Sequence, residues 1–267
     1  MHYIKLYFKL ITTHLYVQLQ YRFTFVVRFI TYNLMPVIDF SILFIYFSNF
    51  DSLSGWNAWE VAIIYCITSS GFALTETFAR GFDTFPYLVQ NGSFDRMLLR
   101  PASTVFQVMA SDFPFIRLTK VVYGIVFLIM AGMKLQLDLT YFQVLILVIT
   151  ILSCACMFTS LFVIMGAISF ITIAPISIFH LFTDGTREVG KYPISVYPKW
   201  FARFYIFMIP IGCVTYFPTL YILGKPDIVF NTTSTVQIMA AFVGFLFVFV
   251  SFAIWNLCRR RYLSTGS

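Results

Sequence analysis

Charged side chains are scarce in this chain. Only 11% of its 267 residues are Asp, Glu, Lys or Arg, whereas 60% are hydrophobic and the mean hydropathy is +0.84. A soluble domain carries about 25% charged residues. A chain of this length has no core large enough to bury so much apolar surface, so that surface must face lipid. The composition therefore excludes a soluble protein and predicts one all-α membrane domain over residues 1–267.

Groups suited to metal or nucleotide chemistry are also few. The three histidines, His2, His14 and His180, are scattered, and the five cysteines show no metal-ligand spacing. No Gly-rich loop is followed by Lys-Ser or Lys-Thr, and the Gly-Lys-Pro string at 224–226 is no phosphate cradle. We therefore expect no catalytic residue, metal or cofactor in this chain, and no ATP hydrolysis by the chain itself.

Acidic residues are outnumbered, and the formal net charge is +7. Basic residues in membrane proteins mark the cytoplasmic side and attract anionic lipids. We therefore take the positive charge to reflect the orientation of the protein in the membrane and its contacts with anionic lipid, and not nucleic-acid binding. Residues 1–22 are typical of an interfacial helix with a basic face. Arg259, Arg260 and Arg261 follow the last apolar stretch. Both termini are therefore expected in the cytoplasm. We expect the membrane, which the protein spans several times, to be a bacterial plasma membrane.

Apolar stretches of spanning length recur along the chain, because one helix crosses the bilayer in about 20 residues. The predicted spans are 23–47 (or 29–47), 56–78, a third ending at Met133, two within 141–182 that turn near Gly166, and 236–257. Two cytoplasmic ends need an even number of crossings, so the proline-broken stretch 204–223 becomes a re-entrant hairpin. Residues 183–235 then form an external loop and that hairpin. In a competing model, 141–182 crosses once as an overlong, broken helix, which places Arg187 and Lys191 inside. Both models stay open.

One polar, basic segment, Asn91 to Pro101, follows the second span. Glycines and prolines divide 80–101 into short helices near the inner face, at about 82–90 and 94–99. Its apolar side chains can enter a groove on a soluble partner and its arginines can form charge pairs, since aromatic residues and Arg are common interface anchors. The docking candidates are Phe82, Phe85, Tyr87, Leu88, Phe94, Asp95, Arg96 and Arg100. The alternative is a helix pair that touches only lipid headgroups.

Two strings in the chain resemble a known family. The string QNGSFDRMLLRPA at 90–102 is similar to the signature of type-2 ATP-binding-cassette (ABC) exporter permeases, where a Gly, a Phe-Asp pair and Leu-Leu-Arg-Pro follow the second span. The string YPISVYPKWFARF at 192–204, with the prolines at 210 and 218, resembles the region before the last span in that family. One departure is that Phe170-Ile171 stands where a Phe-Trp pair often opens the fifth span.

The resemblance implies six transmembrane helices, a cytoplasmic coupling helix after the second span and a re-entrant element before the last. It also implies two partners, a cytoplasmic ABC ATPase subunit that binds ATP and Mg, and a second copy of this permease or a homologous one. The expected function is the permease subunit of an ATP-driven exporter for an amphipathic or hydrophobic substrate such as a drug, a peptide or a lipid-linked molecule. The alternative is a stand-alone secondary transporter or channel, which would be expected to show paired halves with matching broken helices.

Ionisable residues within apolar stretches are the remaining functional candidates. Each costs at least about 2.5 kcal/mol at the bilayer centre, so it usually faces protein or water. The translocation or gating candidates are Asp39, Glu76, Asp112, Arg187 and Glu188. Asp39 lies mid-span, Asp112 and Glu76 lie near the inner interface and Glu60 near the outer one, and the expected partners of these acidic residues are Arg28, Arg117 or Lys120. Each of these side chains either lines a path or forms a structural pair between helices, and the cluster at 184–191 either seals the outer exit or is a solvated loop.

Overall fold

The computed structural model describes residues 12–13, 16–50, 52–100, 103–172 and 178–262, and the elements in this part of the chain are all helical. Four of its helical segments are long and apolar enough to cross a membrane, and there are up to six candidates if each of two bent helix pairs counts as one span. The four are α2 (Arg22–Asn49), α3 (Ala58–Phe78), η1 with α8 (Phe115–Lys134) and α9 (Tyr141–Thr172). The bent pairs are α11 (Lys199–Phe207) with α12 (Ile211–Leu223), and α13 (Ser234–Ala240) with α14 (Val243–Arg259).

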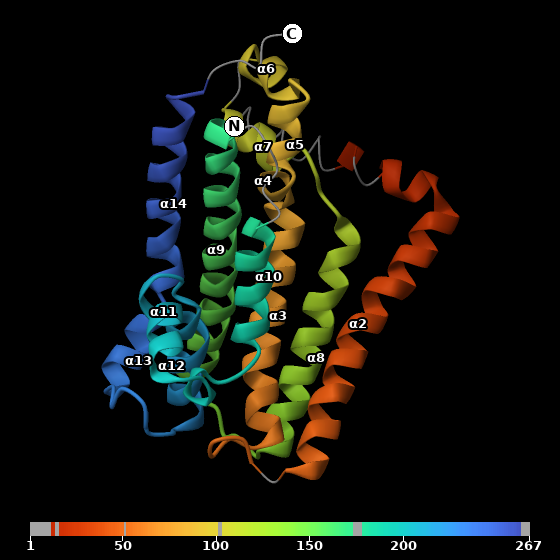
Figure 1. Ribbon diagram of the computed structural model, residues 1–267. Helices are drawn as coiled ribbons and strands as arrows, with labels where there is room; N and C mark the ends of the chain where they lie inside the picture. The colour runs from red at the N-terminus through yellow and green to blue at the C-terminus, as the bar shows by residue number, and fades with distance from the viewer. Residues whose placement is uncertain (1–11, 14–15, 51, 101–102, 173–177, 263–267) are drawn as a thin grey trace.

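The long helices run side by side and give the molecule two distinct ends (Figure 1). Four short helices gather at the end where α2 begins and α14 finishes, which we call the α6 end. They are α4 (Arg80–Asp83), α5 (Phe85–Gln90), α6 (Ser93–Leu98) and α7 (Thr104–Met109). The pair α11 and α12 lies with α13 toward the opposite end, which we call the α12 end.

Residues 141–172 form one unbroken helix of 32 residues, so the prediction of two passes with a turn near Gly166 is wrong. A Cβ atom at Gly166 would lie 3.2 Å from both the Phe82 carbonyl oxygen and the Trp255 ring. This glycine thus allows neighbouring chain segments to approach the helix and does not turn it. The competing model of a single overlong helix agrees with the structure from Tyr141 to Thr172.

The segment that follows also differs from the expectation. Helix α10 (Ile178–Gly190) occupies the place where we expected a loop from residue 183. It runs alongside α3 and α9 at mid-height in the bundle (Figure 1). One face of α10 is therefore held among other helices. The proline-broken stretch is sharply bent, with α11 and α12 meeting at an angle of 100°, a geometry shared by a re-entrant hairpin and a broken span.

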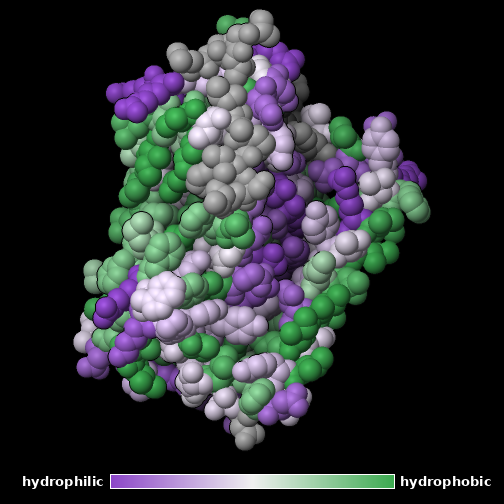
Figure 2. All heavy atoms as spheres, viewed as in Figure 1, coloured by the Kyte–Doolittle hydropathy of each residue, from purple (hydrophilic) through white to green (hydrophobic). Residues whose placement is uncertain are grey.

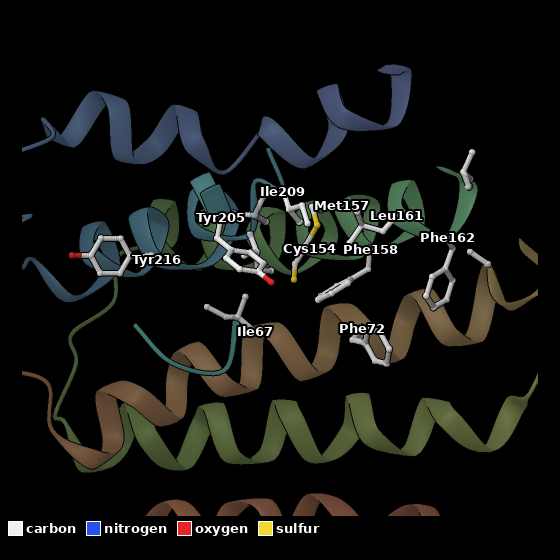
Figure 3. Close-up of a cluster of buried hydrophobic side chains, with 14 of the residues drawn as sticks. Ile67, Phe72, Cys154, Met157, Phe158, Leu161, Phe162, Tyr205, Ile209 and Tyr216 are labelled. Atoms are coloured by element: carbon white, nitrogen blue, oxygen red, sulfur yellow. The ribbon is translucent and has the colours of Figure 1, made fainter. Parts of the chain in front are cut away.

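Helix α3 is the centre of the bundle. In its spanning window 83% of the residues are buried, against 17% in α2. The Phe72 ring of α3 packs edge-on against Phe158 and Phe162 of α9, with ring centres 5.0 and 6.1 Å apart (Figure 3). Gly71 brings the two helices close enough that a Cβ there would collide with Cys154. Helix α2 is thus the least enclosed of the long helices.

The α12 end is fastened by polar contacts between distant parts of the chain. The Lys225 ammonium lies 2.6 Å from Glu60 Oε2 and donates to the Gly55 carbonyl oxygen at 3.0 Å. It also sits 5.0 Å from the centre of the Trp56 ring, whose Nε1–H donates to Ser195 Oγ. Because Glu60 also belongs to the capping box that begins α3, the chain after α12 is tied to the start of that central helix.

Candidate translocation crevice and coupling surface

Helix α10 and the residue after it carry two stripes of opposite charge. Residues four apart share one face of a helix. Asp184 and Glu188 form an exposed acidic stripe, and the Glu188 side chain is 58% exposed. Arg187 and Lys191 form a basic stripe turned toward the bundle, with side chains 25% and 9% exposed. The two faces of this element therefore meet different surroundings.

The basic stripe meets Asp39 from α2. Asp39 Oδ2 accepts hydrogen bonds from the Lys191 ammonium and the Tyr65 hydroxyl, both at 3.2 Å. Arg187 lies 4.0 Å from the same oxygen, and Lys191 also pairs with Glu188 at 2.8 Å. Asp39 thus joins α2, α3 and α10. Of the cations expected to pair with the intramembrane acids, Arg117 and Lys120 contact Glu76, whereas the closest ion pairs of Asp39 are with the basic stripe.

A second charged group lies nearer the α6 end and is centred on Glu76 of α3. Arg117 contacts its carboxylate directly, and Arg80 and Lys120 lie 3.7 and 3.8 Å away. The Arg117 and Lys120 charges both sit over the Tyr32 ring of α2, at 5.3 and 5.5 Å from its centre. Glu76 and Arg117 are almost fully buried, so each requires the other to remain charged.

A third group completes the series at the α6 end itself. Arg80 lies 2.6 Å from Asp83 and 4.0 Å from Asp112. His180 of α10 is 3.6 Å from Asp83, and the two attract when the imidazole is protonated. Burial raises the pKa of the Asp83 carboxyl, an effect that Arg80 partly opposes. Arg80 reaches both Glu76 and Asp83, and so links this group to the second one.

Together the three groups form a polar crevice, defined here by Asp39, Glu76, Arg80, Asp83, Arg117, Lys120, Arg187 and Lys191. Figure 2 shows hydrophilic surface in the middle of the view, with hydrophobic surface on either side of it. A small cavity of about 20 Å³ lies within the crevice and is lined by Asp39, Lys120, Arg187 and aromatic rings of α3 and α8. It has room for about one water molecule. Charges held at this depth are costly in lipid and are expected beside water or a polar solute.

Of the coupling candidates, Phe82, Phe85 and Phe94 do not lie on the surface. All three are fully buried, and we correct their expected role as exposed anchors. The Phe85 ring lies 4.9 Å from that of Trp255 on α14 and 5.0 Å from that of Phe170 on α9. These five rings form an aromatic block that ties the short helices to the ends of α9 and α14.

Tyr262, three residues beyond the end of α14, adds a polar contact. The Tyr262 ring packs edge-on against Phe94 at 5.2 Å, and its hydroxyl donates to Asp95 Oδ1 at 2.9 Å. Burial and this hydrogen bond to a carboxylate raise the pKa of Tyr262 to about 12. Asp95, which we expected in docking, is therefore engaged by the chain's own C-terminal end.

The exposed coupling surface consists of Tyr87, Arg96, Leu98, Leu99 and Arg100. Tyr87 is 54% exposed and Leu99 is 86% exposed. The two leucines were missed in the sequence, although they stand between the two arginines in the string RMLLR at 96–100. Leu88, a further candidate, is half-buried against the core. The surface thus combines apolar tips with two positive charges on a rigid base.

The structure brings Asp39, Arg187 and Glu188 into one group and Glu76 and Asp112 into the adjoining ones. Sequence reasoning missed Lys191 and Tyr65 as partners of Asp39, and Arg80 and Asp83 as members of the crevice. The four-residue spacing of Arg187 and Lys191 was a usable signal for the basic stripe. The partners of Asp39 lie 26 and 152 residues away in the chain, a separation that no local pattern reveals.

A family model described as ABC-2 family transporter protein matches residues 33–266. No curated protein and no solved structure matches the chain. The match covers all four helical segments of spanning length and both bent pairs, with only the first part of α2 outside it. It confirms the resemblance carried by the strings at 90–102 and 192–204. The chain is therefore a multi-pass membrane permease of the ABC-2 transporter family.

Proposed function

We propose that this chain is the permease subunit of an ATP-driven exporter, which moves an amphipathic or hydrophobic substrate across a bacterial plasma membrane. A separate cytoplasmic ABC ATPase would bind ATP and Mg and supply the energy. The observation that carries this proposal is the combination of a charged crevice inside the bundle with an exposed surface on a packed aromatic block. The charged crevice is suited to form a path for a solute, and the exposed surface is suited to transmit a movement of a partner to the helices.

The ATPase docks on the exposed coupling surface in this proposal. Tyr87 and Leu99 provide apolar knobs, while Arg96 and Arg100 provide charges for acidic groups on the partner. The buried rings beneath, among them Phe85, hold α5 and α6 against α9 and α14. A displacement of the coupling surface would therefore reach the long helices without being absorbed by loose packing. In this proposal the α6 end and both termini lie in the cytoplasm.

The membrane layout that fits this orientation has six crossings. They are α2, α3, α8, α9, α10 with the residues after it, and the pair α13–α14. The pair α11–α12 enters and leaves from the outer side. Non-helical backbone at its 100° bend is tolerated at membrane depth because the pair packs on other helices. Residues 16–20 are helical, in keeping with an interfacial helix, while 1–11 and 14–15 lie outside the described residues.

A second permease, either another copy or a homologous chain, covers the open side of the crevice. The support is the acidic stripe, because Asp184 and Glu188 are exposed on α10, and this helix lies at mid-height in the bundle. Carboxylates that face lipid at that depth would be costly. A second chain over α10 and α2 would shield them and enclose the crevice as a path between the two subunits.

The docking proposal is tested by co-purification of the ATPase from cells that express both subunits. Arg96→Glu with Leu99→Ala should abolish recovery of the ATPase, because it reverses a charge and removes an exposed anchor. Lys199→Glu with Trp200→Ala is the matched control, since both residues are exposed on α11. Undiminished recovery with the Arg96 and Leu99 pair would refute the docking surface. Labelling of a cysteine at position 96 from outside the cell would refute the orientation.

A further inference from the structure

We propose that the crevice accepts the anionic headgroup of an amphipathic substrate, with Lys120 and Arg187 as the groups that bind it. This inference rests on the proposed function and specifies its substrate class. The headgroup chemistry is a phosphate or carboxylate that can accept hydrogen bonds from both cations at once. The apolar part of the same molecule would lie against the hydrophobic sides of α2 and α8.

The first support is the distribution of charge around the small cavity. Its charged lining consists of two cations, Lys120 and Arg187, and one carboxylate, Asp39. Asp39 already accepts a hydrogen bond from Lys191, whose side chain is only 9% exposed. Neither Asp184 nor Glu188 lines the cavity. The wall of the cavity thus carries more positive charge than its own carboxylate neutralises.

The second support is the length of the ion pairs that the two cations make. The carboxylate nearest to Lys120 is Glu76 at 3.8 Å, and Glu76 also receives the closer contact from Arg117. The carboxylate nearest to Arg187 is Asp39 at 4.0 Å. Neither distance is that of a charge-assisted hydrogen bond, which is about 2.7–2.9 Å. Both cations therefore retain donors for an anion that enters between them.

The third support is that aromatic faces hold these cations in place. The Arg187 guanidinium lies 5.1 Å from the centre of the Phe72 ring, and the Lys120 ammonium lies 5.5 Å from that of Tyr32. A ring stabilises a nearby cation without neutralising its charge. The two cations are thus positioned in advance on α8 and α10, on either side of the cavity, and remain electrostatically available.

Access to the cavity is provided by α2. The cavity of about 20 Å³ is too small for a whole headgroup, and Met35, Pro36 and Asp39 of α2 form one of its walls. With 17% of its spanning window buried, α2 is the wall with the fewest packing constraints. Outward movement of α2 would widen the cavity toward the lipid, and a bound anion would then bridge α8 and α10.

The test uses the detergent-purified complex of permease and ATPase, with labelled dodecyl phosphate as the probe. We expect saturable binding that dodecyltrimethylammonium and inorganic phosphate do not displace. Lys120→Gln and Arg187→Gln should each weaken the apparent Kd about tenfold or more, since a hydrogen bond to a charged group contributes about 1.5–3 kcal/mol. Lys120→Arg, which keeps the charge, should bind nearly as the wild type does. Lys199→Gln is the control, because this exposed cation lies on α11, away from the crevice.

Equal displacement by the cationic amphiphile, or unchanged affinity in both glutamine variants, would overturn the proposal. Displacement by inorganic phosphate at the same concentration would overturn the amphipathic part of it. A photoreactive dodecyl phosphate on the wild-type complex gives a result that does not depend on any variant folding. It should label α8 between Lys120 and Phe127, and labelling confined to the lipid-facing side of other helices would refute the site. The ATPase should co-purify in every case, so a failure here is distinct from a failure of the proposed function.

Discussion

Replacing Phe85 by Ala tests whether the coupling region stands on a packed base. The Phe85 side chain is fully buried, and its ring lies within 5.0 Å, centre to centre, of those of Phe94, Phe170 and Trp255. Truncating a buried Phe costs about 3–5 kcal/mol, from lost burial and the cavity left behind. A domain is typically stable by about 5–15 kcal/mol, so this variant should lose about a fifth or more of that margin.

Tyr87→Ala is the matched comparison, because Tyr87 is on the same short helix and is 54% exposed. Its removal should change stability by about 0.5 kcal/mol or less. Both variants would be unfolded in mixed micelles with increasing SDS, with intrinsic fluorescence as the readout. ATPase binding would be measured on the folded fraction. We expect Phe85→Ala to unfold at a markedly lower SDS fraction, and Tyr87→Ala to remain stable but bind the ATPase more weakly.

The opposite pattern would refute this reasoning. If Phe85→Ala were as stable as the wild type and had lost the ATPase, the side chain would be a surface anchor, and the aromatic block would not exist as described.

Three further predictions follow from particular contacts. Asp39→Asn should lower the ATPase turnover of the reconstituted complex without reducing expression, because Lys191 loses its charged acceptor on α2; unchanged turnover would make Asp39 a structural residue. Tyr262→Phe should cost about 1–2 kcal/mol by removing the hydrogen bond to Asp95. That contribution should be complete below pH 10 and fade as the pH rises through about 12, where folded Tyr262 loses its proton, so the unfolding curves of wild type and variant should converge there. Gly81→Val should abolish stable expression, because its Cβ would overlap a backbone carbonyl of α7, and normal yield would contradict that packing.

Much of the architecture was accessible from composition and local pattern. Lipid-soluble stretches, the short helices of 80–101 and the break near Pro210 follow from hydropathy and from helix-breaking residues, which act locally. The turn near Gly166 was predicted wrongly because the local sequence is the same in two cases. A glycine in an apolar run can end a helix at a turn, or it can let another chain segment pack closely against an unbroken helix. Only the positions of Phe82 and Trp255, distant in sequence, decide between the two.

The candidate site was predicted less completely than the fold. Intramembrane charge by itself singled out Asp39 and Glu76, since a buried ion is costly wherever it lies, whereas Arg187 was a candidate only as part of the polar cluster at 184–191. Which ion meets which depends on the heights at which α2, α3 and α10 pass one another, and the sequence contains no local signal for those heights. The same limit explains why Phe85 was taken as an exposed anchor, because an aromatic residue in a short amphipathic helix can face either side.

The length of α9 has a consequence for the position of the proposed ATPase relative to the membrane. At 1.5 Å per residue its 32 residues extend about 48 Å, whereas the hydrocarbon layer is about 30 Å thick. Its final turns, with Gly166 and Phe170, are the part on which the aromatic block rests. If this extra length projects at the α6 end, the aromatic block and the coupling surface lie outside the hydrocarbon layer of the membrane. An ATPase could then push and pull on the coupling surface without dehydrating its own surface against the headgroups.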